Sequence, residues 1–173
     1  MGDVITQSGM DFAADNAFHI EESPLYKSAG DRVRTVEFIR IIGNRLLFIE
    51  AKTTFANPDN PAGGNFIRFE SEIDQICEKF IHSLNMYSSV KVGVADNPFP
   101  ERFMPPEKIS IVFVLVIKNH EIEWCKPIYA KLVETLPLYL KKIWKPHVIV
   151  MNHEIAMKWN LVVSCADTPH TGF

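Results

Sequence analysis

The apolar run from Ile109 to Ile117 is the feature of this sequence that most limits its fold. It reads ISIVFVLVI, so an extended chain here places apolar side chains on both faces. A strand of this kind has to be covered on both sides, as at the centre of an α/β sheet. The run is also far shorter than the roughly 18 residues that a membrane-spanning helix needs, so we expect no membrane partner.

The composition is that of one folded domain. The chain has 173 residues, of which 47% are hydrophobic and 23% are charged, and a single core serves a chain of this length. The formal net charge of -3 argues against a nonspecific coat for nucleic acid. The three cysteines are widely spaced and odd in number, which excludes a disulfide framework and favours a reducing, cytoplasmic location.

Other patterns place strands and helices around the apolar run. Residues 33–42 and 45–54 are rich in β-branched residues, and Gly43-Asn44 between them is a turn signal, so these residues predict an antiparallel hairpin. Apolar residues at helical spacing predict a helix over about 66–88. The remaining predictions are an extended segment at 18–22, a helix over 124–144 broken by Pro137, a strand at 148–151 and a short helix at 155–159.

These elements predict a single α/β domain over residues 18–165. We expect three layers, with helices flanking both faces of a mixed central sheet. Residues 1–17 show no sustained period and are expected to form a flexible lead-in, and residues 166–173 a C-terminal tail. Apolar side chains such as Trp159, Phe103 and Met104 would serve a homodimer if they are exposed.

The predicted hairpin brings two acidic residues together. With a two-residue turn, Ile42 faces Arg45 and Glu37 faces Glu50, and paired residues share one face of the sheet. Lys52 lies on the same face, two residues beyond Glu50. Facing glutamates repel and lose hydration, and a divalent cation relieves both costs. Mg²⁺ or Mn²⁺ prefers such oxygen ligands, and a nearby lysine can hold a nucleophile or stabilise phosphate charge.

The same residues also allow a purely structural interpretation. Glu37 or Glu50 can form an ion pair with Lys52, Arg40 or Arg34 at the end of the sheet. The Glu37–Glu50 pair is then a structural feature of an α/β domain with no chemistry of its own.

Residues 36–37, a short turn and residues 48–52 (Phe-Ile-Glu-Ala-Lys) resemble the signature of the restriction-endonuclease-like phosphodiesterases, the PD-(D/E)xK superfamily. The resemblance implies that fold over about residues 18–151. It implies Glu37 and Glu50 as ligands of Mg²⁺ or Mn²⁺, the Ala51 carbonyl as a further ligand, and Lys52 as the residue that assists the nucleophile. The function implied is a metal-dependent nuclease acting on DNA or RNA. The alternative is a non-catalytic binding or assembly module with the same fold.

Second-rank candidates lie on three neighbouring segments. Glu21 or Glu22 is the best substitute for the acid that the family's leading helix often supplies. Residues on the helix after the Glu-x-Lys strand sometimes approach the metal in that family, and a solvated helix face is the alternative for them. Ligands also favour the ends of strands in α/β sheets. The remaining candidates are therefore Gln75, Lys79 and His82 on the helix, and Lys118, Asn119 and His120 after the buried strand.

Overall fold

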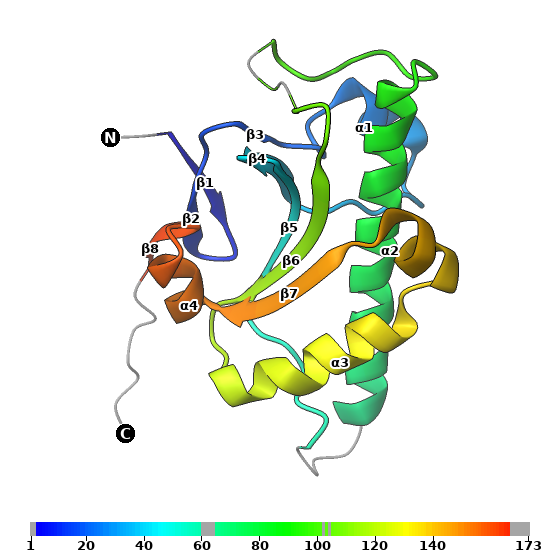
Figure 1. The fold of residues 1–173 in the computed structure, drawn as a ribbon. Coiled ribbons are helices and arrows are strands. Elements are labelled where there is room, and N and C mark those ends of the chain that lie inside the picture. Colours follow the sequence, from blue (N-terminus) through cyan, green and yellow to red (C-terminus); the bar gives the residue numbers. More distant parts are fainter. Residues whose placement is uncertain (1–2, 60–64, 102, 104, 167–173) are drawn as a thin grey trace.

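The computed structural model describes residues 3–59, 65–101, 103 and 105–166, and its centre is a five-stranded mixed sheet in the order β3-β4-β5-β6-β7 (Figure 1). The strands are β3 (Ala17–Phe18), β4 (Phe38–Ile42), β5 (Arg45–Lys52), β6 (Ser110–Ile117) and β7 (His147–Asn152). The pairs β3–β4 and β4–β5 are antiparallel, and β5–β6 and β6–β7 are parallel. The predicted mixed α/β class is confirmed.

The apolar run forms β6, between β5 and β7. Its side chains alternate between two hydrophobic cores: Phe113 and Leu115 belong to the core on one face of the sheet, and Val112 and Val114 to the core on the other. All four side chains are at most 4% exposed. The expectation of a strand covered on both faces is therefore confirmed.

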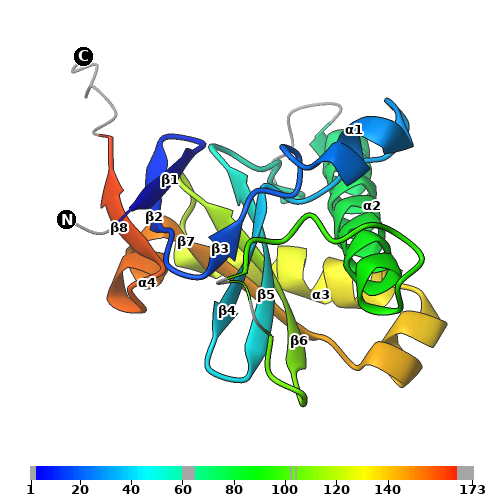
Figure 2. The ribbon, with the colours of Figure 1, turned by 90° about the horizontal axis from the view of Figure 1, so that it is seen from above.

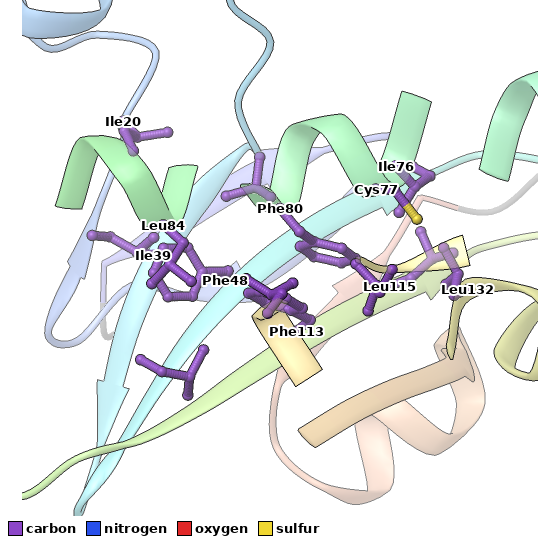
Figure 3. Packing of buried hydrophobic residues seen from close by; sticks show 14 of the residues in the cluster. Ile20, Ile39, Phe48, Ile76, Cys77, Phe80, Leu84, Phe113, Leu115 and Leu132 are labelled. Carbon is purple, nitrogen blue, oxygen red and sulfur yellow. The ribbon is translucent and has the colours of Figure 1, made fainter. Parts of the chain in front are cut away.

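Helices cover one face of this sheet. They are α2 (Asn65–Lys91) and α3 (Cys125–Thr135), with the short α1 (Pro24–Ala29) nearby (Figure 2). Phe80 of α2 stacks on Phe113 of β6, with ring centroids 4.5 Å apart (Figure 3). The predicted break at Pro137 is confirmed: α3 ends at Thr135, and a π-helical turn follows at Leu140–Trp144.

A second, three-stranded antiparallel sheet covers the other face, in the order β1-β2-β8. It consists of β1 (Val4–Gln7), β2 (Met10–Ala13) and β8 (Val162–Cys165), and α4 (His153–Lys158) lies beside it (Figures 1 and 2). The structure differs here from the expectation of helices on both faces. It differs also from the expected lead-in at 1–17, because the side chains of Met10 and Phe12 are fully buried in the second core.

Three other expectations have mixed outcomes. The extended segment predicted at 18–22 is reduced to β3, which ends at Phe18. Phe103 was expected to serve a dimer if exposed, but it is 3% exposed and packs against Phe99, whereas Trp159 is 61% exposed. Met104 and residues 167–173 of the predicted tail lie outside the described residues.

In the part of the chain that the structure describes, no helix has the length and apolar character to cross a membrane.

Candidate functional site

Glu50 is the buried centre of the candidate site. It lies near the end of β5, where alternate side chains point toward α2, and Phe48 two residues earlier packs in the α2-side core. The Glu50 side chain is 0% exposed. Burial raises the pKa of Glu50 to about 7, and the positive charge of Lys79 opposes that shift. The carboxyl group is therefore held where water cannot stabilise its charge.

Glu37 lies opposite Glu50 in the predicted register. The paired residues run from Ile42 and Arg45 at the turn to Phe38 and Ile49, which confirms the two-residue turn. Glu37 directly precedes β4, so it is next in register to face Glu50. Its side chain is 17% exposed, so this carboxylate is more accessible than that of Glu50. Gly43 in the turn has a φ of +59°, a conformation that glycine adopts at little cost.

Lys79 of α2 lies between the two carboxylates. Its Nζ atom donates a hydrogen bond to Oε1 of Glu50 at 2.7 Å and is 3.9 Å from Oε1 of Glu37. The Nζ atom of Lys52 is 3.7 Å from the same Oε1 of Glu50. Two acidic and two basic side chains from β5, α2 and the segment before β4 therefore form one cluster. Glu37, Glu50, Lys52 and Lys79 were all candidates from the sequence, although Lys79 was second-rank.

The second carboxylate oxygen of Glu50 has no partner among the residues that the structure describes. Its Oε2 atom is buried and makes no hydrogen bond with any described residue. A buried polar atom without a partner costs about 1–3 kcal/mol, and more when it is charged. Such an atom is a place where a cation, a water molecule or a substrate group would gain a favourable contact.

The helix α2 also holds the chain that leads to Glu37. The Oγ atom of Ser83 accepts a hydrogen bond from the backbone N–H of Val36 at 2.9 Å and donates one to the Lys79 carbonyl at 2.7 Å. Nδ1 of the neighbouring residue, His82, accepts a hydrogen bond from the backbone N–H of Arg34. These contacts fix the position of Glu37 relative to Lys79. The His82 side chain therefore binds the backbone before β4. Ser83 positions the same segment and was not among the candidates from the sequence.

Glu21 is the third acidic residue near the cluster. Burial raises its pKa, the negative charge of Glu37 adds to the shift, and the positive charge of Lys79 opposes it. The carboxyl group of Glu21 is therefore close enough to interact electrostatically with both Glu37 and Lys79. Glu22 is exposed. Of the two alternatives offered by the sequence, Glu21 is the one whose electrostatics link it to the cluster.

The candidates after β6 make other contacts. The ammonium group of Lys118 donates a hydrogen bond to the Ala166 carbonyl at 2.6 Å, on the side of the small sheet. Asn119 is exposed, and its backbone N–H pairs with the Thr53 carbonyl. His120 is buried against Trp124, and burial lowers its pKa, which favours the neutral ring. The side chains of Lys118 and His120 therefore contact other parts of the molecule than the glutamate cluster.

The last two candidates from the sequence are the Ala51 carbonyl and Gln75, and both make hydrogen bonds outside the glutamate cluster. The Ala51 carbonyl accepts a hydrogen bond from the Ser8 hydroxyl at 3.0 Å, which uses one of its two lone pairs. The side-chain amide of Gln75 donates a hydrogen bond to Ser71 on the exposed surface of α2. Ser8 was missed by the sequence analysis because it lies in a segment that carried no strand pattern.

Within the described ranges, no three histidine, cysteine, aspartate or glutamate side chains converge closely enough to hold a metal ion. A cation at this cluster would therefore rest on the Glu37 and Glu50 carboxylates together with backbone oxygen and water. Mg²⁺ commonly binds in that way, through one or two carboxylates and several waters.

A cavity of about 860 Å³ lies away from the cluster. Its lining includes Arg45 and Ser110 at the starts of β5 and β6, Met151 near the end of β7, and Tyr129 of α3, but none of the four cluster residues. The glutamate cluster and this cavity are therefore separate features of the sheet.

Comparison with known proteins identifies no relative: no protein-family model, no curated protein and no solved structure matches this chain.

Proposed function

We propose that this chain is a divalent-metal-dependent nuclease that hydrolyses phosphodiester bonds of DNA or RNA, on a restriction-endonuclease-like form of the α/β fold. The observation that carries the proposal is the buried, unpartnered Oε2 atom of Glu50 beside a second carboxylate. The sequence resemblance over residues 36–37 and 48–52 supplies the class of reaction, and the register of β4 and β5 supports it because it sets Glu37 opposite Glu50.

The donor atoms suit Mg²⁺ or Mn²⁺. Glu37 and Glu50 would hold the ion through carboxylate oxygens, which are the ligands that both metals prefer. The Ala51 carbonyl retains one lone pair beyond its bond to Ser8. Glu21 adds a third carboxyl group within electrostatic range. When bound, such an ion supplies an acidified water molecule and positive charge for the phosphate.

Lys52 is the residue placed to meet the substrate. Its side chain is 33% exposed, and its ammonium group is 3.7 Å from Oε1 of Glu50. A phosphate oxygen approaching from solvent can therefore reach it without displacing buried groups. A positioned ammonium group of this kind stabilises the charge that develops on phosphate as the water oxygen bonds to phosphorus and the leaving oxygen departs with a proton.

Cleavage assays test this function directly. We expect the wild type with Mn²⁺ or Mg²⁺ to cut plasmid DNA, single-stranded DNA or RNA. Glu50→Gln should abolish both cleavage and Mn²⁺ binding, whereas Lys52→Ala should lower the rate at least about 100-fold while Mn²⁺ still binds in calorimetry. Glu154→Gln, on the exposed part of α4, is the matched control and should match the wild type. Equal cleavage by Lys52→Ala and the wild type would point to another site or to a contaminating enzyme.

A second candidate function is a non-catalytic binding or assembly module. The observation that favours it is that Lys79 already bridges the two carboxylates, as a structural ion pair would. A wild type that binds nucleic acid in the presence of a chelator, but takes up no Mn²⁺ at millimolar concentration, would favour the module and exclude the nuclease.

A further inference from the structure

We infer that Lys79 is the resident cation of the Glu37–Glu50 pair, and that a divalent metal ion binds there only in competition with it. The inference rests on the proposed metal site and assigns the control of that site to a residue of α2. Lys79 is in this view a positioning residue that acts on the occupancy of the site.

The contacts single out Lys79 rather than Lys52. Among the described residues, only Lys79 forms ion pairs with both carboxylates, at 2.7 Å from Glu50 and 3.9 Å from Glu37. Lys52 reaches Glu50 alone, at 3.7 Å, and its side chain is about twice as exposed. The ammonium group of Lys79 therefore lies between the two carboxylates that would bind a metal.

Simple electrostatics makes the two cations exclusive. With Lys79 in place, its positive charge offsets the repulsion of two glutamates in a poorly hydrated site. A divalent ion on this carboxylate pair, whether on Oε1 or on the free Oε2 of Glu50, would lie within several ångströms of the ammonium group bound to Oε1. At that separation like charges repel strongly at low dielectric. Lys52 also belongs to the cluster and Glu21 borders it, but neither spans the carboxylate pair.

The structure gives Lys79 a way to leave. The backbone of Lys79 is fixed, because its carbonyl accepts the Ser83 hydroxyl and the next residue, Phe80, stacks on Phe113. The side chain beyond it is a flexible four-carbon stem and is 17% exposed. Rotation of that stem toward solvent would vacate the site while α2 stays in place. The free-energy cost of moving the ammonium group is small because water hydrates it strongly.

Calorimetric titration with Mn²⁺ tests the competition. We expect Lys79→Gln to bind Mn²⁺ at least about tenfold more tightly than the wild type, because one neighbouring charge shifts such equilibria by one to three powers of ten. Lys158→Gln, exposed on α4, makes the same change in net charge and should bind as the wild type does. Without metal, the Lys79→Gln protein should also melt at a lower temperature than the wild type. Added Mn²⁺ should raise the melting temperature of the variant more than that of the wild type.

Lys79→Arg provides a second test that retains the ion pair and the fold. A guanidinium group is always charged and can bind carboxylates through two hydrogen bonds, so Mn²⁺ binding should be weaker than in the wild type. Equal Mn²⁺ affinities in the wild type and both Lys79 variants would overturn the competition but leave the metal site intact. No Mn²⁺ binding by any of these proteins would overturn both the site and the competition.

Discussion

Glu50 is a carboxyl group in a place that favours its uncharged form. Burial raises its pKa from the ordinary value of 4.5 to about 7, against the opposing charge of Lys79. Between these values the folded protein holds a proton that the unfolded chain has lost. The free energy of unfolding therefore falls as the pH rises from about 4.5 to about 7.

The variant Glu50→Gln isolates this effect, because an amide of the same shape does not titrate. In urea unfolding with a chelator present, the wild type should lose stability relative to Glu50→Gln between pH 5 and pH 8. The relative loss should be on the order of 3 kcal/mol at most. Glu21 titrates in the same direction in both proteins, so its contribution largely cancels. Parallel stability curves for the two proteins would show that Glu50 is not perturbed.

The same residue scale shows what local rules can predict. The sequence placed Glu37, Glu50 and Lys52 on one face, because side-chain alternation and a two-residue turn depend only on neighbouring residues. The role of Lys79 could not be found in that way. Its contact with Glu50 depends on how α2 is aligned on the sheet, which packing such as Phe80 on Phe113 decides. The signal available was a lysine beside the apolar stripe of the helix.

At the scale of elements, α2 both packs in the core and holds the segment before β4 by hydrogen bonds, a contact called the clamp below. Its apolar stripe packs on β5 and β6, and one turn of it holds the segment before β4 through Ser83 and His82. The position of Glu37 therefore depends on a helix hydroxyl as much as on the hairpin.

Ser83→Ala tests the clamp. The variant leaves the buried N–H of Val36 without an acceptor, so we expect a loss of about 1–3 kcal/mol in the free energy of unfolding and weaker Mn²⁺ binding. Ser88→Ala is the matched control, because that hydroxyl bonds to the Leu84 carbonyl within the same helix. Chemical unfolding and calorimetry measure the two effects. If the two serine variants behave alike, the clamp has no role.

Long periodic elements could be predicted and short ones could not. The strand β6 and the helix α2 carry enough apolar residues at regular spacing to be found from the sequence. The strands β1, β2 and β8 have four residues each, and β2 pairs with β8 from the other end of the chain. Such short strands form because they pair and pack with distant parts of the chain, and a local sequence pattern does not contain that information.

For the whole molecule, the two ends of the chain close the second core. Phe12 of β2 is fully buried and packs edge-to-face on Phe38 of β4, with ring centroids 5.2 Å apart. Leu161 and Val162 join the same core from the C-terminal side. The central sheet is therefore covered by helices on one side and mainly by a small sheet on the other.

Phe12→Ala tests whether this small sheet is part of the domain. Removing a buried phenylalanine costs about 3–5 kcal/mol, so we expect a loss of that size in the free energy of unfolding. Val4→Ala, at a position that is 50% exposed in the adjoining strand, should change stability by less than about 1 kcal/mol. Urea unfolding measures both. A loss below about 1 kcal/mol for Phe12→Ala would show that the ends of the chain fold independently of the sheet.

A crystal structure of the wild type soaked in Mn²⁺ tests the central claim most directly. We expect an anomalous density peak about 2.1 Å from carboxylate oxygens of both Glu37 and Glu50, with the ammonium group of Lys79 moved away from them. Crystals that show no peak at this position, with Lys79 still bridging the two glutamates at saturating Mn²⁺, would contradict the metal site and the nuclease proposed from it.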